Sequence, residues 1–310
     1  MKFANPASSS IEFSVIAGRV STEDSDRIIE TLEALRNQEG RPNYEVLLVD
    51  RLGDSISEQI KNNYPNVKLI RCEPQVDLPT MRTIALKQSV GQVVAVTEDH
   101  CVPATDWLEN LRNIFDENRS ANVVGGCVIN GVDDSGLDWA TFLCEYSAFM
   151  PPVAEGPTDN VPGMNVAYKR SVFDSVPEEV LTRGFWETTL HPRLVSEGQK
   201  FISANSVRMF HCKKFSFGLF LRQRFIYSRY FAGIRFKKGE IGQRLVASAA
   251  CVILPPLLLF RFLRSIRKRN HMRKTILVAM PYLLAFYCVW AVGEAVGYLF
   301  GPADALSRIE

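Results

Sequence analysis

A short apolar run that ends in a cluster of polar side chains constrains the fold of this chain more than any other feature. Val93–Val96 contains three valines and an alanine, and after one threonine it is followed by Glu98, Asp99 and His100. In open α/β sheets, ligands bind just beyond the carboxyl ends of the strands. We therefore expect a buried strand here, and a site for a divalent metal, a diphosphate, or both at its end.

Apolar runs typical of strands alternate with segments that have helical spacing over the first 130 residues. This alternation predicts an α/β fold in which helices cover both faces of a mostly parallel sheet. By contrast, Asn130–Val161 shows neither pattern and is expected to be irregular. The expected strands are Phe13–Ala17, Tyr44–Val49, Val67–Arg71, Val93–Val96 and Ala121–Ile129, and the expected helices are Glu23–Arg36, Ile56–Asn63, Thr80–Ser89, Trp107–Phe115 and Thr188–Gly198.

Missing motifs and the distribution of charge exclude several classes of protein. No G-x-G-x-x-G turn follows the first strand and no G-x-x-x-x-G-K-[ST] loop occurs, so dinucleotide and P-loop enzymes lose their main support. The seven cysteines form no C-x-x-C pair, which is typical of buried thiols in a reducing compartment. The formal net charge is +2, but residues 261–274 carry seven Lys and Arg and no acid. The rest of the chain is therefore acidic, which argues against nucleic acid as a partner.

Two apolar segments and a basic loop characterise the C-terminal end. The segments cover about 245–260 and 275–300, and the loop is 261–274. The second segment is long enough to span a bilayer and the first is short. Pro255 and Pro256 are expected to break or kink a helix within the first segment.

Three membrane arrangements remain open from the residues alone. The first segment is either a re-entrant or interfacial helix with both ends cytoplasmic, or one half of a two-span hairpin. Alternatively, both segments are core helices of a soluble protein. Because positive loops prefer the cytoplasm and anionic lipid head groups, we expect the 261–274 loop on the cytoplasmic side.

Further candidate side chains stand where strands end or helices begin. Asp50 ends the second expected strand, and Arg82 opens the helix before the acidic cluster. Glu187, in the run GFWE, precedes the helical segment Thr188–Gly198. Because the carboxyl ends of parallel strands meet at one edge of a sheet, such residues are candidates for a common site.

In order and spacing, these motifs resemble the membrane-attached family-two glycosyltransferases of the GT-A fold, over about residues 11–235. YEVLLVD ends in Asp50, TMRTIAL supplies Arg82, and VVAVTEDHCVP follows in the family's order. GFWETTLHPRLVSEG resembles the segment that carries the family's catalytic acid. VPGMNVAYKRSVFDSV resembles the acceptor-side segment, with Gly163, Asn165 and Arg170. On this basis, residues 1–235 are a GT-A domain and 236–310 a membrane-associated region.

The resemblance implies a metal site at the acidic cluster. Glu98 and His100 align with the two acids of the family's D-x-D motif, and residues two apart in an extended chain point the same way. Together with His211, they are expected to hold Mn²⁺ or Mg²⁺, and the imidazoles tilt the preference away from Mg²⁺. Some roles stay open, since either Asp99 takes over a ligand role or His100 meets the diphosphate directly. His211 is either a third metal ligand or a phosphate contact.

Roles in catalysis and donor binding are implied in the same way. Glu187 stands where the family places its catalytic Asp. LRQRFIYSRYF resembles the Q-x-x-R-W segment of processive relatives, but it lacks the Gln, which weakens the case for a processive synthase. Asp50 is expected to contact the nucleobase. The full set expected to bind the donor is Asp50, Arg82, Asp99, Arg222 and Arg224.

The expected function is inverting transfer of a sugar from a nucleotide-diphosphate sugar to a lipid-linked or cell-envelope acceptor. The expected location is the cytoplasmic face of a membrane, with membrane lipids as partners. The alternative is a non-catalytic membrane scaffold or nucleotide-sugar sensor that retains the fold, because the metal motif reads Glu-Asp-His.

Overall fold

The computed structural model describes residues 11–21, 23–236, 240–267, 269 and 272–309, and its chain forms two compact units. The sheet unit comprises Met1–Gly131 and Phe149–Lys213, and the helical unit comprises Val132–Ala148 and Lys214–Glu310. The helical unit thus includes two helices that precede residue 236, where the sequence-based boundary was placed, because both pack on the long C-terminal helix of this unit. Lys268, Asn270 and His271 of the expected basic loop lie outside the described residues.

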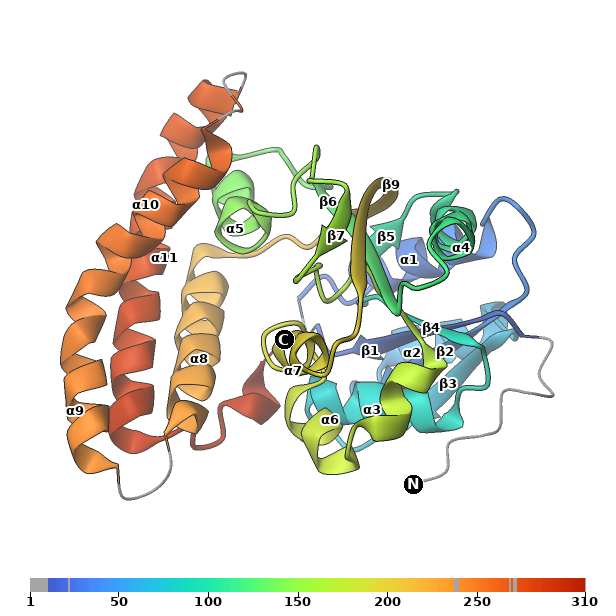
Figure 1. The fold of residues 1–310 in the computed structure, drawn as a ribbon, viewed down its shortest axis with the longest axis horizontal. Helices are drawn as coiled ribbons and strands as arrows, with labels where there is room; N and C mark the ends of the chain where they lie inside the picture. Colours follow the sequence, from blue (N-terminus) through green and yellow to red (C-terminus); the bar gives the residue numbers. More distant parts are fainter. Residues whose placement is uncertain (1–10, 22, 237–239, 268, 270–271, 310) are drawn as a thin grey trace. The chain divides into compact units, whose positions relative to one another are not determined.

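A mixed nine-stranded sheet forms the centre of the sheet unit (Figure 1). The order is β3-β2-β1-β4-β8-β6-β9-β5, and β7 also pairs with β9. Strands β3, β2, β1 and β4 are mutually parallel, whereas β8 is antiparallel to both of its neighbours. The strands are β1 Phe13–Arg19, β2 Tyr44–Asp50, β3 Val67–Arg71, β4 Val93–Val96, β5 Cys101–Pro103, β6 Val123–Asn130, β7 Gly156–Thr158, β8 Val166–Lys169 and β9 Phe201–His211.

The parallel strands bring their carboxyl ends to a single edge. The chain builds β1, β2 and β3 in one direction and then crosses to β4 on the other side of β1. The edge between β1 and β4 is therefore the point where the strand order reverses, which is where open α/β sheets bind ligands. The register places Arg19 beside Asp50, and Asp50 beside Arg71, at the ends of three neighbouring strands.

Helices cover both faces of this sheet, as the alternation predicted, with α1 and α4 on one face and α3 on the other (Figure 1). Side-chain caps explain where two of them begin: Asp54 accepts from two backbone N–H groups of α2, and Asp77 accepts from one of α3. The helices of the sheet unit are α1 Arg27–Arg36, α2 Ser55–Asn63, α3 Leu78–Gln88, α4 Trp107–Glu117, α6 Glu178–Gly184 and α7 Leu190–Ser196, with a 3₁₀ helix at Arg170–Ser175.

The expectation that Asn130–Val161 is irregular is wrong. The segment contains α5 Gly136–Tyr146 and the short strand β7. Ser135 caps α5 by accepting from the N–H of Asp138. The helix packs on the C-terminal helix of its unit, so apolar side chains surround much of it and hide the one-sided pattern of an amphipathic helix.

The helical unit is organised around α11, which packs against α5, α8, α9 and α10. Two of its glycines permit close approach to α8, because a Cβ atom at Gly293 or Gly297 would overlap atoms of that helix. The remaining elements of this unit are α8 Phe217–Arg235, α9 Ile241–Ala250, α10 Leu254–Ile266 and α11 Arg273–Phe300, with 3₁₀ helices at Cys251–Ile253 and Leu306–Arg308.

The two apolar segments form an antiparallel helical hairpin. Ile241–Ile266 and Arg273–Phe300 are each long and apolar enough to span a membrane. The start of the first lies beside the end of the second, since Arg244 donates to the carbonyl of Tyr298. Pro255 and Pro256 occupy the first turn of α10, where their missing N–H groups cost nothing, so the helix breaks after Ala250 and restarts. An antiparallel hairpin fits both the two-span and the re-entrant alternatives, so the choice between them stays a prediction.

Asn165 stabilises the sheet unit through three buried hydrogen bonds, and a substitution can measure their contribution. It is fully buried, accepts from Trp107 Nε1, and donates to the carbonyls of Cys127 and Val207. We expect Asn165→Ala to lower the free energy of unfolding by about 3 kcal/mol, because three buried polar groups lose their partner. Denaturant unfolding followed by tryptophan fluorescence measures this. Asn113→Ala, at an exposed helix position, is the control and should change the value by less than about 0.5 kcal/mol.

Candidate active site

Asp50 lies at the expected edge of the sheet as a fully buried anion between two arginines. Arg19 approaches one carboxylate oxygen at 3.4 Å and Arg71 the other at 2.6 Å. The N–H of Leu52 and the hydroxyl of Ser57 donate to the same carboxylate. Asp50 therefore has its charge compensated within the protein, and a nucleobase would meet it beside Arg71, whose side chain is half exposed.

Arg82 connects the acidic cluster to the segment that carries Glu187. Its guanidinium is buried, and it donates to Glu98 Oε1 at 2.8 Å and to the carbonyl of Phe185 at 2.9 Å. One side chain thus holds the end of β4 next to the turn between α6 and α7. The structure brings together Arg82, Glu98 and the Glu187 turn, as the sequence predicted for a common site.

Asp99 points away from Glu98, toward the turn that follows β1. It accepts from the backbone N–H groups of Val20 and Ser21 at 2.7 and 2.9 Å, and from the Ser21 hydroxyl at 2.9 Å. The His100 ring nitrogen Nδ1 lies 2.7 Å from Oδ1 of Asp99. Burial alone would raise the pKa of Asp99, but the contacts with His100 and Lys213 outweigh it, so the pKa lies well below its usual range.

A small group of potential metal ligands lies at this edge. Glu98, His100 and Cys101 each offer one ligand atom, and these atoms lie within 4.8 Å of one another. A carboxylate, an imidazole and a thiol form a mixed donor set that fits a divalent transition metal such as Mn²⁺ better than Mg²⁺. Cys101 was missed by the sequence analysis because no C-x-x-C or other metal-binding spacing marks it.

The end of β9 contributes two more buried side chains. His211 stands opposite Cys101 in the β5–β9 ladder, and its ring packs edge-on against His100 with centroids 4.9 Å apart. Burial is the main reason that the pKa of His211 lies well below its ordinary value, and the nearby charge of Lys213 adds to the effect. Its role as a third ligand stays a prediction. Lys213, also missed, is buried and lies 3.1 Å from the Ser21 hydroxyl.

Glu187 lies on the turn before α7, half buried and directly over Gly163. A Cβ atom at position 163 would overlap Oε2 of Glu187, so the absence of a side chain at Gly163 lets the carboxylate occupy its place. By contrast, Asn165 and Arg170 of the same expected acceptor-side segment are buried. Asn165 bonds to backbone carbonyls, and Arg170 donates to the Gly91 carbonyl and the Ser89 hydroxyl.

Arg222 and Arg224 belong to α8 in the helical unit. Arg222 is exposed. Arg224 is buried and forms an ion pair with Glu145, and the Phe220, Tyr227 and Trp290 rings lie within 5.6 Å of its guanidinium carbon. Within its unit Arg224 thus compensates a buried acid, and donor binding by either arginine stays a prediction.

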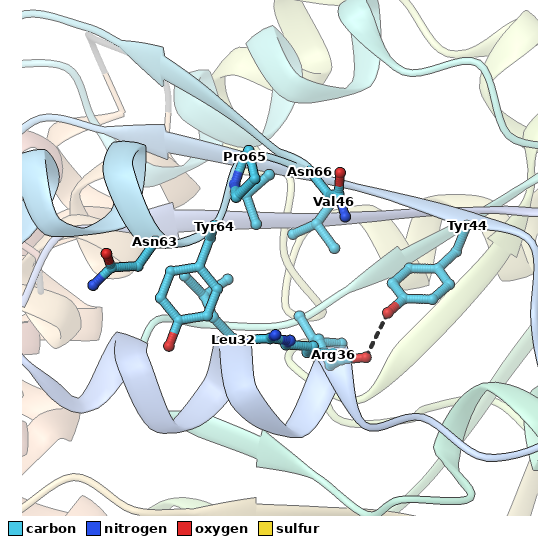
Figure 2. Close-up of a pocket in the computed structure, with 10 residues that line it drawn as sticks. Leu32, Arg36, Tyr44, Val46, Asn63, Tyr64, Pro65 and Asn66 are labelled. Atoms are coloured by element: carbon cyan, nitrogen blue, oxygen red, sulfur yellow. Dashed lines mark hydrogen bonds between the residues drawn. The ribbon is translucent and has the colours of Figure 1, made fainter.

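A separate cavity of about 350 Å³ lies at the opposite end of the parallel strands (Figure 2). It is lined by the end of α1, the start of β2 and the loop from Asn63 to Val67, which precedes β3. Its Tyr44 hydroxyl already donates to the carbonyl of Leu35 at 2.6 Å (Figure 2). Because it adjoins the amino ends of β2 and β3, this cavity is distinct from the acidic edge.

Comparisons with known proteins agree with this geometry. Residues 21–176 match the model of the glycosyl transferase family 2. A relative from Haloferax volcanii, a glucosyl-dolichyl phosphate glucuronosyltransferase, is 24% identical over 179 residues, which cover 53% of this chain and 54% of the relative. The chain thus matches about half of the length of that curated relative.

One solved structure shows the same fold. The mannosyltransferase PcManGT from Pyrobaculum calidifontis, in complex with GDP-Man and Mn²⁺, is 17% identical with a TM-score of 0.57, covering 94% of this chain and 88% of that chain. S. aureus TarS 1-349 in complex with UDP is 14% identical with a TM-score of 0.48, covering 92% and 91%.

The family match makes this chain a glycosyltransferase, and the sheet has the GT-A fold that PcManGT shares. The family match covers half of the chain and includes the β1–α1 turn, Asp50, Arg82 and the acidic cluster. The chain belongs to glycosyl transferase family 2.

Gly163 offers a direct test of the position of Glu187. If Glu187 is the base that the resemblance implies, we expect Gly163→Ala to displace its carboxylate and to lower kcat for sugar transfer about 100-fold, since small misplacements of a reacting group are costly. Initial rates with the transferred nucleotide sugar measure this. Gly218→Ala is the matched control, because its new Cβ atom would meet open space, and its rate should stay within twofold of the parent.

Proposed function

We propose that this chain transfers a sugar from a nucleotide-diphosphate sugar to a lipid-linked acceptor, with inversion at the anomeric carbon. The observation that carries the proposal is the convergence of Arg82, Glu98 and the Glu187 turn at one sheet edge. Family membership favours an active enzyme over a non-catalytic scaffold or sensor. A neighbour in fold contains GDP-Man and Mn²⁺, which supports a nucleotide-sugar donor.

Glu187 is the proposed general base. Its carboxylate is half buried and held over Gly163, where it remains accessible to an acceptor. It takes the proton of the acceptor hydroxyl while that oxygen forms a bond to the anomeric carbon and the bond to the diphosphate breaks. Because attack comes from the face opposite the leaving group, the configuration of the sugar inverts.

Glu98 and His100 are the proposed holders of a divalent metal, with Mn²⁺ favoured over Mg²⁺ by the imidazole and the adjacent thiol. Such an ion supplies positive charge where the nucleoside diphosphate leaves. Arg82 keeps Glu98 in place through its 2.8 Å contact. Lys213 adds a buried cation at the same edge.

The nucleobase is proposed to lie at the far end of the same edge, beside Asp50 and Arg71. The Arg71 guanidinium covers Gly53, and its side chain is half exposed, so a base can reach it from solvent while it stays paired with Asp50. Arg222 and Arg224 are kept as proposed donor contacts on the strength of the resemblance alone.

The helical hairpin is the proposed membrane attachment. Its first helix carries a large share of the exposed apolar side chains of the described residues, including Val246, Val252 and Phe260. The relative acts, by its name, on a glucosyl-dolichyl phosphate, which supports a lipid-linked acceptor. We place the sheet unit on the cytoplasmic face together with the basic loop 261–274, as in the re-entrant arrangement.

Replacement of the proposed base should abolish most turnover without loss of donor binding. We expect Glu187→Gln to lower kcat by about 10² to 10⁴, because the amide cannot accept the proton. A panel of nucleotide sugars with a glucosyl-dolichyl phosphate acceptor, which offers sugar hydroxyls, measures transfer. Calorimetry measures donor affinity, which should stay within threefold.

Glu197→Gln is the matched control, because it is the same substitution at an exposed position ten residues after Glu187. It should keep parental kcat. Full transfer activity in Glu187→Gln would refute the assignment of the base.

Removal of divalent metal should stop transfer, and Mn²⁺ should restore it better than Mg²⁺. The reason is the donor set at Glu98, His100 and Cys101, which contains nitrogen and sulfur in place of a second carboxylate. Rates after chelation and titration with each metal provide the measurement. Equal activity with and without chelator would show that the cluster has no metal-dependent role.

A further inference from the structure

The Asp99 carboxylate has no capacity left for a metal or a diphosphate. An ionised carboxylate offers about four lone-pair positions. In Asp99, Oδ2 accepts from the N–H groups of Val20 and Ser21, and Oδ1 contacts the Ser21 hydroxyl and Nδ1 of His100, all at 2.7 to 2.9 Å. The side chain is 3% exposed. All four positions are therefore filled from within the protein.

Chemical complementarity determines which atoms in this cluster carry protons. Lys213 can only donate, so its contact with the Ser21 hydroxyl makes that oxygen an acceptor from Lys213. The hydroxyl proton is then directed to Asp99 Oδ1, 2.9 Å away. Because the carboxylate only accepts, Nδ1 of His100 must carry a proton to make its 2.7 Å contact.

In the neutral imidazole, this assignment leaves the other ring nitrogen of His100 with a lone pair. Nε2 lies 3.5 Å from Glu98 Oε2, which is long for a hydrogen bond but suits two neighbouring ligands of one cation. In metal sites, a ligating histidine commonly donates its second N–H to a carboxylate, which fixes both ring orientation and tautomer. The Asp99–His100 pair has this arrangement.

We propose that Asp99 is a positioning residue that holds His100 in the Nδ1-protonated tautomer, so that Nε2 and Glu98 form the cation site. The inference rests on the metal role in the proposed function, and it replaces the expectation that Asp99 itself supplies a ligand. The same carboxylate holds the β1–α1 turn through Val20 and Ser21. The donor-side turn and the metal ligand are thus fixed by one side chain.

Asp99→Asn is the informative variant. Its amide oxygen can still accept from the two backbone N–H groups, which turns the NH₂ group toward His100. An amide that donates to Nδ1 favours the Nε2-protonated tautomer, as a carboxylate-to-amide change beside a histidine does in catalytic triads. Nε2 then carries a proton and cannot bind a cation.

Two measurements on the full chain in detergent test this, both with Mn²⁺ alone as the probe. Electron paramagnetic resonance of free Mn²⁺ should show about 10- to 100-fold weaker binding in Asp99→Asn than in the parent chain. Long-range ¹H–¹⁵N NMR of the metal-free protein should show His100 protonated at Nδ1 in the parent and at Nε2 in the variant. The sequence has four histidines, and His100→Gln identifies the signal.

Two further variants make the result specific. Asp174→Asn, at an exposed position, should leave both readouts unchanged. The double variant Asp99→Asn/His100→Gln should bind Mn²⁺ no more weakly than His100→Gln alone, because Asp99 acts through the histidine.

An Nε2-protonated His100 in the parent chain would overturn the proposal without any variant. So would weaker Mn²⁺ binding in Asp99→Asn with an unchanged tautomer, or an additional loss in the double variant. If the parent chain binds no Mn²⁺, the metal role in the proposed function fails, while the NMR measurement still decides whether Asp99 sets the tautomer.

Discussion

Asp99 accepts four hydrogen bonds, and through them the end of β4 is tied to the turn after β1. These two strand ends enclose the point where the strand order reverses. Without that tie, the backbone groups of Val20 and Ser21 would need other partners and His100 would be free to rotate. The geometry of the candidate site therefore depends on one buried anion that is compensated by His100 and Lys213.

Buried charge at this edge is compensated pair by pair. Asp50 lies between Arg19 and Arg71, and Glu98 is held by Arg82. Isolated buried charges are strongly unfavourable, whereas paired and hydrogen-bonded ones persist. Glu187 and Glu98 are both partly exposed, and Glu187 lies over Gly163 on the turn before α7. Its role as the base is a proposal that rests on this position and on the resemblance.

In the part of the chain that the structure describes, the helical unit is held together mainly by close helix packing and not by a network of buried ion pairs. Its α11 packs on α8 through glycines, and Arg224 and Glu145 neutralise each other within it. Its first apolar helix instead leaves most of its side chains exposed, as a helix that meets lipid would. Pro255 and Pro256 have a local effect on this helix. Its α-helical part α9 ends at Ala250, and α10 begins one 3₁₀ turn later with the two prolines in its first turn.

Alternating apolar runs and helical spacings were sufficient to predict the parallel strands, because each depends on residues near in sequence. Asp50, Arg82 and Glu98 could be placed at one edge for the same reason, since parallel strands share their carboxyl ends. The helix α5, the antiparallel β8, and the contributions of Cys101 and Lys213 required the tertiary structure. The direction in which the Asp99 side chain points also required the tertiary structure. Its partners are Ser21, which is 78 residues away in the sequence, and the adjacent His100, whose orientation is set by packing. Sequence alone thus determined which residues reach the edge, and long-range hydrogen bonding decided which of them face a ligand.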